Sequence, residues 1–168
     1  MPVRSAVNSH TFEATTPSDR EIVLTRLFDA PRRLVFDAMT KPEHVRRWWG
    51  ALDEEHSVTV CEIDLRPGGA WRFVGRGPEG EFPAFYGTYR EIAPPERVVF
   101  TEVFEPYPDV ESVVTSVFTE EGAKTRLTVT CLYPSLDVRD MVLETGMTTG
   151  AGTSYDRLED LVGELQRS

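Results

Sequence analysis

The stretch that decides the fold is DVRDMVLETGMTTGAGTSYDRLEDLVGELQ, residues 137–166. Its apolar residues recur at three- and four-residue spacing, which predicts one long helix with a single buried face. Gly146, Gly150 and Gly152 interrupt this pattern, and each glycine costs about 1 kcal/mol relative to alanine in a helix interior. We therefore expect small residues to be needed where this helix crosses a curved sheet, with a cavity beneath them.

The chain before this helix reads as strands joined by short turns. The predicted strands cover residues 21–28, 58–65, 70–75, 83–92, 97–104, 113–119 and 125–133. Two short helices follow the first strand, and they open at Pro31 and Pro42. Consecutive strands with short turns exclude a doubly wound parallel sheet. The order predicts an α+β fold in which a seven-stranded curved antiparallel sheet surrounds the long C-terminal helix.

The division of the chain follows from the same patterns. Residues 1–19 are polar and lack periodicity, which predicts a flexible N-terminal tail. Residues 20–168 contain no repeat or linker and are long enough for one domain with a buried core.

Charge and composition exclude several classes of protein. A net charge of −10 over 168 residues argues against binding to nucleic acids and to anionic membranes. No apolar run reaches the roughly 18 residues of a membrane span, and no signal pattern opens the chain, so we expect a cytoplasmic protein. Cys61 and Cys131 have no metal or redox spacing, which favours buried free thiols.

One segment of this acidic chain is basic. Residues 26–49 hold six Lys and Arg against three acids, including the pairs Arg32–Arg33 and Arg46–Arg47. Such a segment is typical of a solvated helix face, and the alternative is contact with an acidic partner or an anionic ligand.

Glu102 is the carboxylate with a functional interpretation. No catalytic, phosphate-binding or metal motif is present, so we expect no cofactor, no metal and no catalytic residue set. Alternation with Val98, Phe100 and Phe104 places Glu102 on an apolar strand face. If that face is interior, Glu102 is a desolvated carboxyl and a functional candidate. If the opposite face is interior, Glu102 is a surface residue.

Aromatic residues supply the second candidate. Apolar walls with a few polar groups are typical of small-molecule sites. The predicted ligand cavity is lined by Trp48, Trp49, Trp71, Phe73, Phe85, Tyr86, Glu102, Phe104, Met147 and Gly150. The alternative is that these side chains simply fill the core, and the sequence does not decide which strand face points inward.

Several of these segments resemble a known family. They are FDAPRRLVF at 28–36, WWG at 48–50, DLRPGGAW at 64–71, GTYREI at 87–92, and Gly146-Met147 with Gly150. In this order they resemble the bacterial proteins similar to the activator of heat-shock protein 90 ATPase (AHSA-like), a branch of the START-like (SRPBCC) superfamily. The resemblance runs from about residue 20 to 165 and implies the helix-grip fold of START and birch-pollen-allergen-like proteins.

Three functions remain open from the sequence. The first is binding of a small hydrophobic or amphipathic ligand in the cavity. The second, implied by relatives in the wider superfamily, is a cavity-based enzyme of the cyclase or hydrolase-like type, with Glu102 or His44 as the acid–base group. The third, implied by the resemblance, is a co-chaperone-like activator whose partner is a chaperone or another protein. The sequence leaves the ligand unidentified and allows either a monomer or a homodimer.

Overall fold

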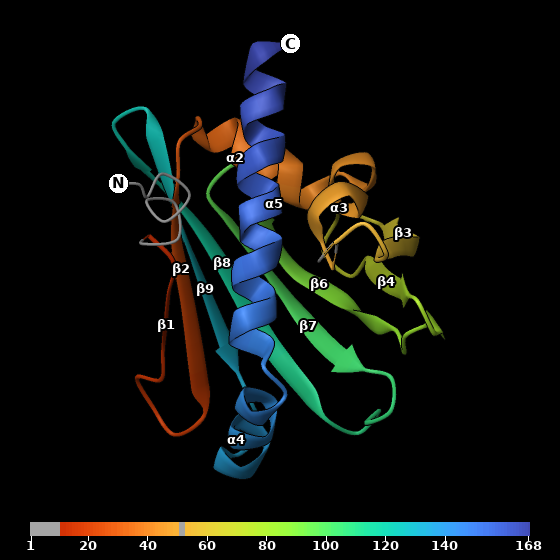
Figure 1. Cartoon of the computed structure of the whole chain (residues 1–168). Helices are drawn as coiled ribbons and strands as arrows, with labels where there is room; N and C mark the ends of the chain where they lie inside the picture. Colours follow the sequence, from red (N-terminus) through yellow and green to blue (C-terminus); the bar gives the residue numbers. More distant parts are fainter. Residues whose placement is uncertain (1–10, 51–52) are drawn as a thin grey trace, which may run out of the picture.

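The computed structural model describes residues 11–50 and 53–168, which form one strongly curved antiparallel sheet with helices on its concave side (Figure 1). Across the sheet the strands run in the order β1-β2-β9-β8-β7-β6-β4-β3, and β5 pairs with β4. The bounds are β1 Glu13–Thr15, β2 Glu21–Phe28, β3 Ser57–Ile63, β4 Ala70–Gly77, β5 Gly80–Glu81, β6 Phe85–Ala93, β7 Arg97–Phe104, β8 Glu111–Glu121 and β9 Lys124–Leu132.

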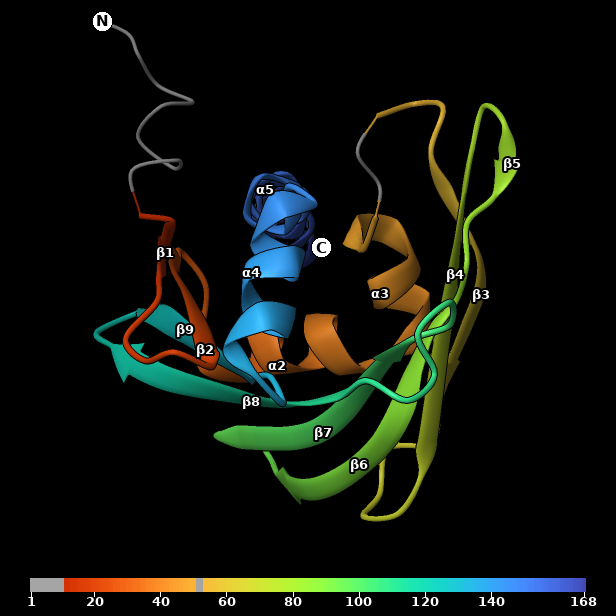
Figure 2. The same cartoon turned by 90° about the horizontal axis from the view of Figure 1, so that it is seen from below.

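The helices of the described residues lie inside the curve of the sheet. Their bounds are α2 Arg32–Thr40, α3 Pro42–Trp48, α4 Leu136–Glu144 and α5 Met147–Arg167. Figure 2 shows α4 and α5 between β1 and β2 on one side and α3 with β3 and β4 on the other. The main backbone neighbours of α5 are α2, α3, α4 and β2.

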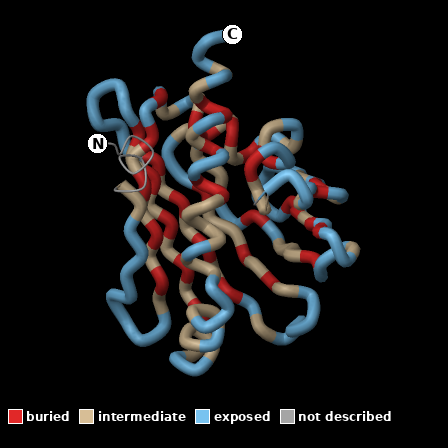
Figure 3. The backbone as a smooth tube through the Cα atoms, viewed as in Figure 1, coloured by how far each residue is buried: buried red, intermediate tan, exposed pale blue. Residues whose placement is uncertain are grey.

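The most deeply buried core residues come from β2, β8 and β9 of the sheet and from α2 and α5. Burial alternates along β2, where Ile22, Leu24, Arg26 and Phe28 point inward, because successive strand residues face opposite sides. β8 and β9 alternate in the same way, as the buried and intermediate segments in Figure 3 show. From α5, the buried side chains are Ser154, Tyr155, Leu158, Leu161 and Val162, in keeping with the predicted helical spacing.

The curved antiparallel sheet, the two short helices and the long C-terminal helix are confirmed, and two strands exceed the predicted seven. One is the short β5 beside β4. The other, β1, falls within the segment predicted to be a flexible tail and pairs with β2. Phe12 beside it packs edge-on against Tyr155, with ring centroids 6.0 Å apart, so apolar contact orders this otherwise polar segment. Residues 1–10 of the predicted tail lie outside the described residues.

The C-terminal segment is two helices rather than the one predicted over residues 137–166. Gly146 separates α4 from α5 in a left-handed conformation with φ of 81°, which glycine adopts without a steric cost. The other two glycines lie inside α5 and differ in the space around them. A Cβ on Gly152 would lie 3.3 Å from the Phe12 ring, whereas a Cβ on Gly150 would meet nothing within 4 Å.

Candidate functional site

The inward face of β7 carries the candidate site. Val98 and Phe100 on this face belong to the core cluster. Thr101 and Val103, from the alternate positions, line a shallow hollow on the outer side of the sheet. Glu102 therefore shares the interior face with Phe100, which decides the question that the sequence left open.

Glu102 lies between two positions without a large side chain. Ser112 of β8 is its register partner, and Gly87 of β6 follows the Tyr86–Val103 pair and so lies opposite Glu102 on the other side. The Trp71 indole crosses Gly87, and its Nε1 donates to the Thr101 carbonyl oxygen at 3.0 Å. A Cβ on Gly87 would overlap that oxygen, so this position must be glycine. The carboxyl is thus flanked by an indole and a serine.

The Glu102 carboxyl is desolvated and has no charged partner among the described residues. Its side chain keeps some exposed area, yet burial raises its pKa to about 7. Among the described residues no hydrogen bond or ion pair reaches its carboxylate, and no cation lowers its pKa. Glu102 is therefore a partly exposed, unpaired carboxyl on the inward face of the sheet, close to the Trp71 indole that crosses Gly87. We call Glu102, Trp71, Gly87 and Ser112 the Glu102 recess.

The tyrosines and the thiol near Glu102 stay neutral. Burial raises the pKa of Cys131 to about 12, and the Glu102 charge adds to this shift. Burial also raises the pKa values of Tyr133 and Tyr155, again with a contribution from Glu102. At neutral pH, Glu102 is therefore the group in this neighbourhood whose charge can change.

A row of aromatic rings extends from the recess toward α3. Trp49 packs edge-on against Phe73 at 5.2 Å and against Phe85 at 5.7 Å between ring centroids. Phe85 stacks on Phe104 at 4.7 Å. Trp71 joins Phe73 to Phe100 at 4.9 and 5.4 Å. We call Trp49, Phe73, Phe85, Phe100 and Phe104 the aromatic wall, and all five keep exposed surface.

The start of α5 carries the other two predicted cavity residues, Met147 and Gly150. Met147 packs against the core cluster, and Gly150 follows three residues later on the same helix face. Ser154, one turn further, accepts a hydrogen bond from the Gly50 N–H at 3.3 Å, just after α3. The open space beside Gly150 therefore lies on the side of α5 that faces α3.

The comparisons with known proteins agree with this architecture. Residues 29–163 match the sequence family described as Activator of Hsp90 ATPase homolog 1-like protein. The chain belongs to this family. The resemblance seen in the sequence is thereby confirmed, together with the START-like fold.

Solved structures similar to this family member come from several bacteria. A protein from Nitrosomonas europaea has 26% identity and a TM-score of 0.80, with 91% of this chain and 100% of that chain covered. A protein from Mycobacterium smegmatis has 27% identity and a TM-score of 0.79, covering 91% and 98%. A protein from Rhodobacter sphaeroides, 24% identical, shares the fold with a TM-score of 0.83, covering 92% and 99%. No functionally curated protein matches the sequence.

The structure of this family member places most of the predicted cavity residues on one face, with two exceptions. Trp48 lies deeper, is 6% exposed, and donates from Nε1 to the Ala38 carbonyl oxygen at 2.9 Å, so it is a core residue. Tyr86 lies on the outer face, where the Arg72 guanidinium sits 5.7 Å from its ring. Phe85 and Tyr86 are neighbours in one strand and must point to opposite sides. The residues on the inward face are Trp49, Trp71, Phe73, Phe85, Glu102 and Phe104, with Met147 and Gly150 opposite them on α5.

The sequence prediction omitted three residues that shape the recess. Phe100 could have been included, because it alternates with Glu102. Gly87 appeared only within the family segment 87–92, and Ser112 gave no signal, since their importance here comes from strand pairing with Glu102.

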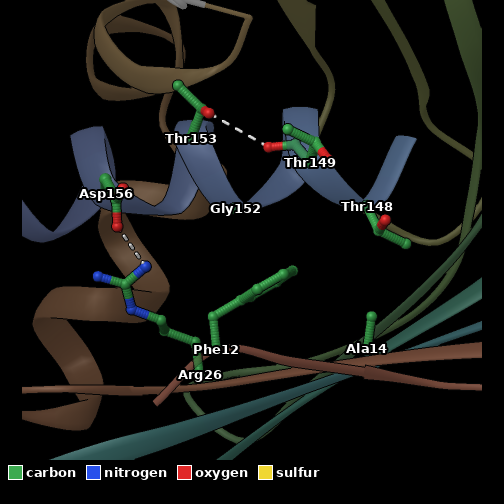
Figure 4. Close-up of a pocket in the computed structure, with 8 residues that line it drawn as sticks. All are labelled: Phe12, Ala14, Arg26, Thr148, Thr149, Gly152, Thr153 and Asp156. Atoms are coloured by element: carbon green, nitrogen blue, oxygen red, sulfur yellow. Dashed lines mark hydrogen bonds and ion pairs between the residues drawn. The ribbon is translucent and has the colours of Figure 1, made fainter. Parts of the chain in front are cut away.

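A separate hollow of about 340 Å³ lies between β1 and the first turns of α5 (Figure 4). Arg26 reaches it with a side chain that is 1% exposed, and its Nη1 pairs with Asp156 Oδ1 at 2.7 Å. Arg26 Nη2 lies 3.9 Å from Glu159 Oε1, whereas Nε and Nη2 have no hydrogen-bond acceptor within the described residues. Two carboxylates thus balance one buried guanidinium, and Phe12 covers the group below α5. We interpret this cluster as the attachment of α5 to β2.

The arginines of the basic segment and the two cysteines take part in contacts within the fold. Arg33 pairs with Asp37 at 3.3 Å, and Arg47 pairs with Glu164 at 2.9 Å. Cys61 and Cys131 are buried free thiols, as predicted. The described residues contain no cluster of His, Cys, Asp and Glu suited to a metal ion. Within the same residues, no helix is both long and apolar enough to cross a membrane.

Proposed function

We propose that this chain binds a small hydrophobic or amphipathic molecule between the aromatic wall and α5, with Glu102 as its polar contact. The observation that carries the proposal is a row of five partly exposed rings on the same inward face as one unpaired carboxyl. A mainly apolar surface with few polar groups is the composition of most small-molecule sites. Membership in a START-like family supports a ligand-binding role in general terms.

Space beside α5 offers a direct test. A Cβ added at Gly150 would have no neighbour within 4 Å, so Gly150→Ala adds little, whereas Gly150→Leu extends into the space facing the wall. We expect the neutral apolar dye Nile red to bind the native chain saturably. Gly150→Leu should weaken this binding at least about tenfold, equivalent to about 1.4 kcal/mol, and Gly150→Ala should change it less than about twofold.

The measurement is a fluorescence titration at fixed protein concentration, with circular dichroism to show that both variants keep their fold. Absence of saturable binding to the native chain, or equal binding by the alanine and leucine variants, would contradict the proposal.

Catalysis is a second candidate, favoured by one specific observation. Glu102 has a pKa of about 7 in a desolvated recess, and a carboxyl tuned to neutral pH can act as a general acid or base. If a substrate that turns over is found, Glu102→Gln should abolish its turnover. Unchanged turnover in that variant would remove Glu102 from the mechanism.

The co-chaperone alternative has weaker support. The family resemblance implies it, with the basic segment of α2 and α3 as a possible contact surface, but Arg33 and Arg47 form ion pairs with acids of this same chain. Intramolecular pairing favours the interpretation of these arginines as a solvated helix surface.

A further inference from the structure

The Glu102 carboxylate has no positively charged partner among the described side chains. A desolvated carboxylate in a protein is normally paired with a cation or with several hydrogen-bond donors. Ser112, the nearest hydroxyl in register, donates instead to the Glu102 carbonyl oxygen at 3.2 Å. Arg26 is held by Asp156 and Glu159. Arg72 pairs with the exposed Glu105 at 3.2 Å. Arg26 and Arg72 are therefore both occupied by other carboxylates and do not pair with Glu102.

The surfaces around the recess also favour a cation. The faces of aromatic rings carry negative electrostatic potential, and a cation within about 6 Å of a ring centroid is attracted to it. The Trp71 indole crosses Gly87, the position opposite Glu102, and Phe100 and Phe104 occupy the neighbouring inward positions of β7. The net charge of −10 adds a long-range attraction for cations.

We propose that the ligand of the Glu102 recess is an amphipathic amine, whose protonated nitrogen pairs with the Glu102 carboxylate while its apolar body lies on the aromatic wall. This inference rests on the proposed ligand-binding function and adds the chemical class of the ligand. An anionic ligand would place two like charges in a desolvated space, which is strongly unfavourable. A neutral hydrocarbon would leave the carboxyl without a partner.

The other titratable groups near Glu102 do not change charge in the pH range of the experiments, so they cannot produce a pH-dependent preference for a cation. Cys131 and Tyr133 on the β9 side and Tyr155 on α5 are neutral at the pH values used below, because burial raises their pKa values. Arg26, the cation that acts on Tyr155, is already held by two acids. A pH dependence of amine binding between about pH 6 and 8 would therefore report on Glu102.

Three probes that share one ring system separate the alternatives by calorimetry. They are naphthylethylamine, which is cationic, propylnaphthalene, which is neutral, and naphthylpropionate, which is anionic. At about pH 8 we expect the amine to bind the native chain at least about tenfold more tightly than the neutral probe, with the anion weakest. Glu102→Gln should reduce the preference for the amine to within about twofold and retain binding of the neutral probe.

The control is Glu79→Gln, which removes the same charge from an exposed position in the turn between β4 and β5. This variant should keep the full preference for the amine. Equal binding of amine and neutral probe, or loss of the preference in both variants, would overturn the amine assignment and leave ligand binding intact. If the amine fails to bind the native chain while Nile red binds, the amine assignment alone fails. If neither these probes nor Nile red binds, the proposed function fails and the amine assignment fails with it.

A second measurement needs no variant. At about pH 6 most Glu102 side chains are protonated, because burial raises the pKa to about 7. Binding of a cationic amine would ionise the carboxyl and release a proton to the buffer. Calorimetry in two buffers of different ionisation enthalpy should show this release with the amine at about pH 6, its disappearance at about pH 8.5, and no release with the neutral probe. If unfolding experiments show the raised pKa of Glu102, binding of the amine at about pH 6 without proton release would overturn the assignment.

Discussion

Glu102 shows how one position in a strand determines the ionisation of a residue. An exposed glutamate in β7 would titrate normally, but the inward position removes water from this carboxyl, and burial raises its pKa from 4.5 to about 7. Between these two pH values the folded protein holds a proton that the unfolded chain releases. The contribution of this group to stability is therefore complete below about pH 4.5 and is lost as pH rises through about 7.

The first prediction concerns Glu102→Gln. The shift corresponds to a loss of up to about 3 kcal/mol in the free energy of unfolding between about pH 4.5 and 8. The variant should lack this loss and should be more stable than the native chain at about pH 8 by up to that amount. Urea unfolding of both proteins across this pH range is the measurement. Parallel stability curves would show that Glu102 titrates normally.

Arg26 is the other inward charge, and it depends on carboxylates from α5. Removing one partner of a buried ion pair costs about 3–5 kcal/mol, because the remaining charge is left uncompensated. Since Glu159 stays at 3.9 Å from Arg26, we expect Asp156→Ala to lower the free energy of unfolding by about 2–3 kcal/mol. The exposed Asp160 on the same helix provides the control, and Asp160→Ala should change stability by less than about 0.5 kcal/mol.

The double variant completes this test. Asp156→Ala leaves the buried Arg26 charge without its main partner, and Arg26→Met removes that charge. The double variant should therefore be more stable than Asp156→Ala alone. An Asp156→Ala loss no larger than that of Asp160→Ala would show that the pair contributes nothing to the attachment of α5.

At the scale of elements, the division between α4 and α5 depends on the backbone of one glycine. Gly146 has φ of 81° and no neighbour within 4 Å of an added Cβ, so the effect of substitution is conformational and not steric. Gly150 has equally free surroundings but lies inside α5. These two positions form a matched pair for separating backbone conformation from packing.

The prediction is therefore opposite in sign at the two positions. Gly146→Ala should destabilise by about 1–2 kcal/mol, because alanine in the left-handed region is strained. Gly150→Ala should stabilise by up to about 1 kcal/mol, because alanine is the better residue in a helix interior. Urea denaturation of both variants provides the measurement. A stabilising Gly146→Ala would mean that α4 and α5 can join into one continuous helix.

For the whole molecule, the dominant electrostatic feature is the net charge of −10. The ion pairs described for exposed side chains are individually worth about 0–1 kcal/mol, so self-repulsion should outweigh them at low salt. Raising the ionic strength from about 0.01 to about 0.15 M shortens the screening length from about 30 to about 8 Å, and we expect the Tm to rise by a few degrees. Calorimetry with sodium and potassium chloride should give the same rise, and a lower Tm in salt would contradict this expectation.

Much of the fold could be predicted because it follows from local rules. Two-residue alternation identified the strands, helical spacing identified the buried face of α5, and Pro67 with Gly68 marked a turn between β3 and β4. The family could also be identified, because its motifs are short and appear in order along the chain. The short β5, the strand β1 and the division of the C-terminal helix were not predicted. β1 is ordered by pairing with β2, and the helix break at Gly146 requires a left-handed residue that the spacing alone did not reveal.

The sequence by itself determined the class of fold, the order of its elements and the residue types available for a site. Only the tertiary structure decided which strand face is interior, that Tyr86 points outward, and that Glu102 lies between Gly87 and Ser112. The physical reason is that alternation specifies two faces without saying which one other elements cover. The pKa of a carboxyl depends on the atoms that replace its water, and in this protein those atoms belong to strands and helices far apart in the chain.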